Sequence, residues 1–117
     1  MNNHHDLLHR HVALFNQGVR TGDFGPMLVH FTDDADLIFA GIPVGPFHGK
    51  AAVAAAYQAQ PPDDEIDVLE TRQEGEALVA VYAWRGVPQQ PAGTMILTPK
   101  GEQIGRLVVI YGAPGAL

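Results

Sequence analysis

Histidines are the side chains of this sequence best suited to move a proton near neutral pH, because an ordinary imidazole titrates in that range. By residue type His48, which stands just before an alanine-rich segment, is the best candidate for a general base. Four more, His4, His5, His9 and His11, crowd the beginning of the chain. His5 and His9 are one helical turn apart, but two imidazoles without a set of carboxylates make a poor metal site. We therefore expect a solvated polar helix face there and no metal.

The acidic run of Asp33, Asp34 and Asp36 is a second candidate for metal chemistry. Alternation counted back from Phe39 turns Asp36 outward and leaves the other two carboxylates in a turn. We interpret this run as a solvated loop. His30 lies near the end of an expected helix, where an imidazolium interacts favourably with the helix dipole, so we interpret it as a structural cap.

The composition excludes several classes of function. The sequence has no cysteine, which rules out disulfides, thiolate nucleophiles and cysteine-based zinc sites. Its net charge is −6 and its seven Lys and Arg residues are scattered, whereas a nucleic-acid module needs them clustered. Neither a signal peptide nor a membrane span is visible. We expect a soluble cytoplasmic protein that binds neither nucleic acid nor membrane.

The candidate residues must be positioned by three helices in the first half of the chain. Apolar residues recur at helical spacing from Leu8 to Val19, and Gly22 stops that helix. Asp23 can cap a second helix, whose apolar positions run to Phe31. A third, alanine-rich helix covers residues 50–60 and ends before two prolines.

Strands account for most of the rest of the chain. We expect them at residues 35–41, 66–72, 77–85, 94–98 and 105–112, with turns at 74–75 and 99–101. The resulting order, α-α-β-α-β-β-β-β, favours an α+β fold in which three helices pack on a curved antiparallel sheet. Such a sheet bends into a cone, whose mouth is a natural ligand site.

Alternation along residues 77–85 gives both faces of that strand an apolar character. Leu78, Ala80, Tyr82 and Trp84 share one face, and Val79, Val81, Ala83 and Arg85 share the other. Two apolar faces suit a pocket on the inside and a partner subunit on the outside. We expect a single domain over residues 1–117, with a flexible tail at 112–117, that forms a homodimer through the outer face of its sheet.

Four segments in this order carry a resemblance to a known family. They are NQGVRTGDF (16–24), HFTDDADLIF (30–39), PFHGKAAVAAAY (46–57) and RLVVIYG (106–112). Together they resemble the nuclear transport factor 2-like superfamily, and within it the SnoaL-like and ketosteroid-isomerase-like proteins, over nearly the whole chain. The resemblance implies a cone with a pocket between sheet and helices, and frequent dimerisation through the outer sheet face.

The catalytic groups that the resemblance implies are missing. Ketosteroid isomerases use a carboxylate on the first strand, a tyrosine on the first helix and a protonated aspartate on a late strand. Those positions fall at Phe39, Phe15 and Thr94, and none of these side chains can do the required work. SnoaL-type polyketide cyclases likewise need a pocket acid near the same late strand, where this chain has Thr94. Related epoxide hydrolases need a paired Asp-Arg-Asp set, whereas here we expect Arg85 to point outward, and no buried pair of aspartates is visible.

The expected inward positions form an apolar pocket with a few hydroxyl groups. They are Phe15, Phe39, Tyr57, Tyr82, Trp84, Thr94, Ile96, Leu107, Val109 and Tyr111. We expect this pocket to bind a small hydrophobic or aromatic molecule without a cofactor. One alternative is an isomerase, cyclase or hydratase acting on a small carbonyl compound, with His48 at the cavity mouth or a tyrosine such as Tyr57 as proton carrier. Another is a non-catalytic dimeric interaction subunit whose cone is filled by its own side chains.

Overall fold

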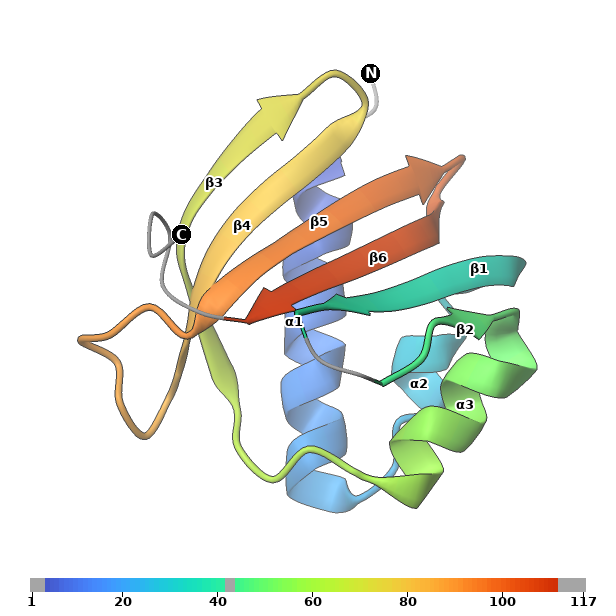
Figure 1. Cartoon of the computed structure of the whole chain (residues 1–117), viewed down its shortest axis with the longest axis horizontal. Coiled ribbons are helices and arrows are strands. Elements are labelled where there is room, and N and C mark those ends of the chain that lie inside the picture. Colours follow the sequence, from blue (N-terminus) through green and yellow to red (C-terminus); the bar gives the residue numbers. More distant parts are fainter. Residues whose placement is uncertain (1–3, 42–43, 112–117) are drawn as a thin grey trace.

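The computed structural model describes residues 4–41 and 44–111, so the expected tail at 112–117 lies outside the described residues. The helices are α1 (His4–Thr21), α2 (Gly25–Leu28) and α3 (Lys50–Ala59). The strands are β1 (Phe31–Ala40), β2 (Phe47–His48), β3 (Ile66–Glu74), β4 (Ala77–Trp84), β5 (Gly93–Lys100) and β6 (Gln103–Tyr111). Figure 1 shows α1 behind the curved sheet, with α2 and α3 beyond β1. The α+β class and the packing of helices on a curved sheet are confirmed.

The strands form one sheet in the order β2-β1-β6-β5-β4-β3. Four of the five neighbouring pairs are antiparallel, but β1 and β6 run parallel, with Asp36 across from Arg106 and Ala40 across from Ile110. The expectation of a purely antiparallel sheet is wrong at this pair. The two strands are joined through α3 and four other strands, so no tight turn forces them to be antiparallel.

The second helix, the first strand and a short additional strand differ from what the sequence predicts. The second helix is a single turn, and Phe31, expected on that helix, is the first residue of β1. Phe31, Ala35 and Leu37 are all buried, and a register shift between Phe31 and Asp36 interrupts the alternation that would have revealed the strand. The two-residue strand β2, unforeseen in a loop rich in Gly and Pro, pairs Phe47 with Leu37.

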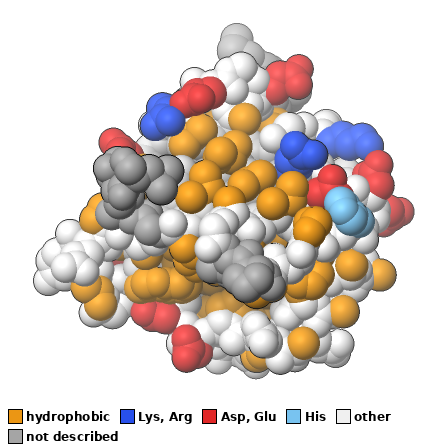
Figure 2. Space-filling view, in the orientation of Figure 1, with side chains coloured by type: hydrophobic (Ala, Val, Ile, Leu, Met, Phe, Trp, Pro, Cys, Tyr) orange, Lys and Arg blue, Asp and Glu red, His pale blue; other side chains and the backbone are white. Residues whose placement is uncertain are grey.

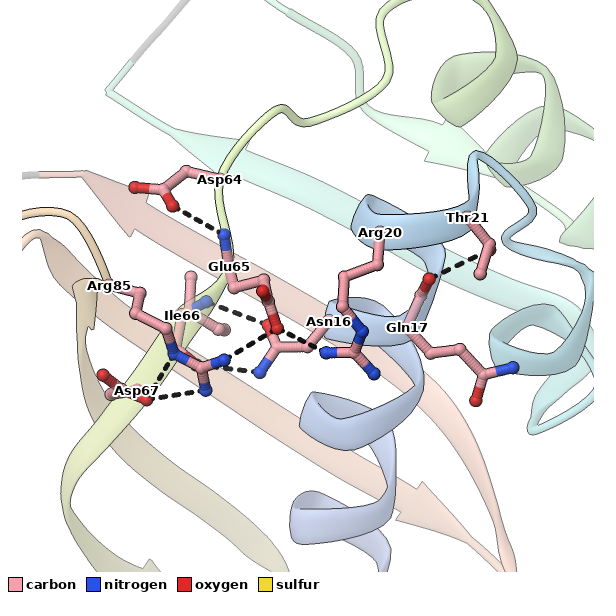
Figure 3. Close-up of polar contacts among 9 residues, drawn as sticks. All are labelled: Asn16, Gln17, Arg20, Thr21, Asp64, Glu65, Ile66, Asp67 and Arg85. Atoms are coloured by element: carbon pink, nitrogen blue, oxygen red, sulfur yellow. Dashed lines mark hydrogen bonds and ion pairs between the residues drawn. The ribbon is translucent and has the colours of Figure 1, made fainter.

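A junction between α1 and β3 fixes the helix against the sheet (Figure 3). The Asn16 side chain, 6% exposed, accepts a hydrogen bond from the Ile66 N–H at 2.9 Å and donates one to the Ile66 carbonyl at 3.0 Å. One amide thus satisfies both backbone groups of the first residue of β3. At the surface beside it, Arg20 and Arg85 both contact the Glu65 carboxylate.

Glycines in the same segment let α2 return onto α1. A Cβ atom on Gly18 would lie 2.3 Å from Cδ1 of Phe24, so only glycine leaves room for that ring. Gly22 ends the helix with a φ of +80°, and its N–H donates to the Gly18 carbonyl at 2.7 Å. No helix in the described part of the chain is long and apolar enough to cross a membrane.

Candidate functional site

Strand register decides which side chains face the helices. Residues paired across neighbouring strands lie on the same face of a sheet, so Met95 shares its face with Ala80 on β4 and Val109 on β6. This is the inner face, because all three contact the buried cluster that includes Leu8 of α1 and Met27 of α2. The inward direction predicted for Ala80 and its face of β4 is therefore confirmed.

A partly open cleft of about 640 Å³ lies between α3 and the inner face of the sheet. One wall is a helix face of small side chains, Ala52, Ala55, Ala56 and Ala59, which leave the space unfilled. The rest of the lining is larger and mostly apolar: Leu37, Phe39, Val44, Phe47, Tyr57, Gln60 and Tyr111. We call this space the outer cleft.

A second space of about 60 Å³ lies deeper, between α1 and the sheet. Its lining comes from α1, β1, α3 and β3 to β6, and consists of His11, Phe15, Phe39, Tyr57, Ile66, Tyr82, Trp84, Met95, Leu107, Val109 and Tyr111. We call it the inner chamber. Phe39, Tyr57 and Tyr111 line both spaces and so stand between them.

Ring contacts hold this partition in place. Phe39 stacks on Tyr111 with centroids 6.1 Å apart, and its edge meets Phe47 at 6.3 Å. Tyr57 of α3 packs on Phe24 at 5.1 Å, so the ring that Gly18 accommodates also supports the cleft. Such offset and edge contacts add to the stability gained from burial alone.

The tyrosine hydroxyls of the site stay protonated near neutral pH. Burial raises the pKa of Tyr57, Tyr82 and Tyr111, and the neighbouring Tyr111 raises the pKa of the first two further. Each hydroxyl can therefore donate and accept a hydrogen bond but does not supply a phenolate base. This disfavours Tyr57 as a proton carrier near neutral pH.

His11 lines the inner chamber, contrary to the expectation of a solvated face. The residue is 3% exposed, and its ring meets the edge of Phe31 at 5.7 Å. Burial, and secondarily the charge of His30, lowers the pKa of His11 to about 4, so its imidazole is neutral at neutral pH. A signal was present, since Leu8 and Phe15 stand three and four residues away on the same helix face.

His48 occupies the outer side of β2 and lines neither space. Its side chain is 71% exposed, and Nδ1 lies 2.6 Å from Oδ1 of Asp36. The expected place at the cavity mouth is wrong, because pairing with β1 puts His48 across from the outward Asp36 while Phe47 points inward. A general base working in the cleft has to be sought elsewhere.

Thr94 and Ile96 also face outward, so their predicted place in the pocket is wrong. Thr94 pairs with Val81 and Ile110, and all of these lie on the face away from the helices. The strand begins at Gly93, which faces inward; a Cβ there would lie 2.9 Å from the Tyr82 hydroxyl. The inward positions of β5 are consequently Gly93, Met95 and Leu97, and this strand presents no acid to the chamber.

The other predicted pocket residues do come together. Eight of them line one or both spaces: Phe15, Phe39, Tyr57, Tyr82, Trp84, Leu107, Val109 and Tyr111. Their role in binding stays a prediction. Sequence reasoning missed the alanine wall, His11, and the apolar residues Leu37, Val44, Phe47, Ile66 and Met95. Arg85 faces outward as expected, bonded to Asp67.

Comparisons with known proteins bear on the fold. No protein with a curated description matches the chain by sequence. The chain is similar to a nuclear transport factor 2-like protein of unknown function from Cytophaga hutchinsonii, with 13% identity, a TM-score of 0.72, and coverage of 96% of this chain and 92% of that one. It is also similar to an uncharacterized cystatin fold protein from Novosphingobium aromaticivorans, with 17% identity, a TM-score of 0.69, and coverage of 94% and 99%.

A third similar structure is a proposed polyketide cyclase from Sinorhizobium meliloti, with 23% identity, a TM-score of 0.58, and coverage of 85% of this chain and 92% of that one. At these identities the three structures support the fold and no particular activity. The model of the SnoaL-like domain matches residues 9–111, which span every strand, α2, α3 and most of α1. The chain therefore belongs to the SnoaL-like domain family, within the nuclear transport factor 2-like superfamily.

Proposed function

We propose that this protein binds a small hydrophobic or aromatic molecule in the outer cleft, without acid–base chemistry of the isomerase kind. The observation that carries the proposal is the outer cleft itself, since about 640 Å³ lies within the range of small-molecule sites. Its alanine wall can receive the flat face of a ring, and Phe39 and Tyr111 offer aromatic contacts opposite.

The chemistry of the lining supports binding over catalysis. Among the described residues that line either space, the polar side chains are Gln60, His11, Trp84 and the three tyrosines, and none is a carboxylate. His48 is exposed on the other side of the sheet, which counts against the enzyme that would use it as a base. The open space of the outer cleft argues against the alternative of an interaction subunit whose cone is filled by its own side chains.

Ligand screening with a blocked variant tests the proposal. Steroids, small aromatics and lipids are screened by thermal shift, and a ligand that binds only the folded state raises the melting temperature. Ala56→Phe places a ring in the outer cleft and should abolish the shift. Ala51→Phe is the matched control, because Ala51 lies on the same helix but is exposed and lines neither space. A screen with no hit, or hits that survive Ala56→Phe, would contradict the proposal.

We propose a second copy of this chain as the partner of the outer sheet face. Across β4, β5 and β6, Val79, Ile96 and Val108 form one apolar row, and Val81, Thr94 and Ile110 form the next. Figure 2 shows hydrophobic side chains gathered over these strands, with charged groups along the margins. At one margin Asp36 lies beside both His48 and Arg106, so a two-fold related copy could set unlike charges opposite each other.

A further inference from the structure

His11 holds a buried nitrogen whose hydrogen-bonding capacity is unused. Within the described residues, its Nδ1 is the buried side-chain nitrogen or oxygen that has no hydrogen-bond partner. Buried polar atoms are nearly always paired, because leaving one unpaired costs more free energy than the hydrogen bond itself contributes. A ligand group that can hydrogen-bond to His11 would therefore bind more tightly than an apolar group of the same size in its place.

The space around His11 limits the size of the group that can reach it. The inner chamber, at about 60 Å³, has room for a few atoms and not for a ring, since an apolar cavity that binds benzene measures about 150 Å³. The outer cleft is about ten times larger and is separated from the chamber by Phe39, Tyr57 and Tyr111. A molecule whose apolar body fills the outer cleft could therefore extend one small polar group past these rings toward α1.

The protonation state of His11 narrows the chemistry of that group. Burial keeps the imidazole neutral, so it offers one N–H donor and one lone pair and does not offer the positive charge that a carboxylate ligand would need. A hydroxyl group can pair with either ring nitrogen, because it both donates and accepts. A hydroxyl can also exchange hydrogen bonds with the phenol of Tyr82, which lines the same chamber.

We propose that His11 sets the specificity of this cavity by hydrogen-bonding a hydroxyl group at one end of an otherwise apolar ligand. The inference rests on the proposed function and deepens it, since it turns a general hydrophobic site into one for aromatic or alicyclic alcohols and phenols. His11 acts here as a binding residue that touches the ligand.

Two probes of nearly equal size test the inference on the full chain. 2-Naphthol and 2-methylnaphthalene differ by a hydroxyl in place of a methyl group, and calorimetry gives the Kd of each. The quantity compared is the preference, the Kd of 2-methylnaphthalene divided by that of 2-naphthol. We expect it to be about five- to tenfold larger in the wild type than in His11→Phe, as one hydrogen bond implies. His11→Gln keeps a donor and an acceptor and should retain part of the difference.

A second test uses NMR on the wild-type protein alone, so it does not depend on whether a variant folds. The ¹⁵N resonances of the His11 ring should move when 2-naphthol is added and stay within about a tenth of that change with 2-methylnaphthalene. An equal preference in wild type and His11→Phe, or ring resonances that respond alike to both probes, overturns the role of His11 and leaves the proposed function standing. If neither probe binds and no other apolar compound does, the proposed function fails as well.

Discussion

At the scale of single residues, burial decides the protonation of the polar groups in this site. Tyr57 and Tyr82 keep their protons because an apolar lining disfavours phenolate, and His11 stays neutral because the same surroundings disfavour imidazolium. The cavity thus retains hydrogen-bonding groups but no net charge from them near neutral pH. That combination favours neutral ligands over ionic ones.

The lowered pKa of His11 predicts a loss of stability in mild acid. The unfolded chain takes up a proton on this residue near pH 6.5, whereas the folded chain does so only near pH 4, so the free energy of unfolding falls as the pH drops through that window. Between about pH 7.5 and pH 4.5 the loss should be on the order of 2 to 3 kcal/mol. Urea unfolding at the two pH values measures it.

Two variants separate His11 from other acid-sensitive groups. His11→Phe removes this contribution, so its stability should depend less on pH than that of the wild type by about the same 2 to 3 kcal/mol. His9→Gln is the control, because it removes an exposed histidine of the same helix and leaves the buried site intact. If His11→Phe and the wild type lost equal stability in acid, His11 would not be the neutral buried group described here.

At the scale of elements, the site depends on how α1 is attached to its neighbours. Phe15 and His11 reach the inner chamber only while α1 keeps its register against β3, and the Asn16 amide is the buried polar contact that sets this register. The Phe24 ring, seated on Gly18, connects the same helix to Tyr57 in the outer cleft. Helix packing and pocket shape are therefore linked through few side chains.

Asn16→Ala should destabilise the protein far more than the loss of a surface contact nearby. The substitution leaves the N–H and carbonyl of Ile66 without partners in a buried position, at a cost of about 2 to 4 kcal/mol. Arg20→Ala removes an exposed ion pair with Glu65 in the same junction and should cost less than about 1 kcal/mol. Chemical unfolding compares the two, and similar costs would contradict the role given to Asn16.

Gly18→Ala and Gly22→Ala distinguish a steric requirement from a backbone one. The Gly18 variant must displace the Phe24 ring, at a cost of about 1 to 3 kcal/mol, and the displacement should reach Tyr57 and weaken ligand binding in the outer cleft. The Gly22 variant has open space around its methyl group and should cost about 1 to 2 kcal/mol through its positive φ alone. Unfolding and ligand titration of both variants test this, and unchanged affinity in Gly18→Ala would break the proposed link.

At the scale of the whole molecule, the sequence predicts the layers better than it predicts the faces. Periodicity and punctuation located all three helices and five of the six strands, because those signals are local. The parallel pairing of β1 with β6 depends on contacts between distant segments of the chain, and local periodicity contains no information about such contacts. The family resemblance puts Thr94 at the position of the late-strand acid, and Ile96 shares its face. Alternation alone does not correct this face, because β5 has apolar side chains on both sides. His48 was misplaced for a related reason, since only the unforeseen β2 decides that Phe47 points inward instead.

The apolar outer face gives the last prediction, which concerns assembly. Ile96 stands between Val79 and Val108 in the middle of that face, so a charge there would be buried without a partner in a dimer formed through it. We expect light scattering after size exclusion to give twice the chain mass for the wild type and for Ala56→Phe, and the chain mass for Ile96→Glu. Val87→Glu is the matched control, because Val87 is equally apolar and 48% exposed but lies in the loop between β4 and β5, and this variant should stay dimeric. A monomeric wild type, or an Ile96→Glu variant that still forms the dimer, would mean that two copies do not meet across β4, β5 and β6.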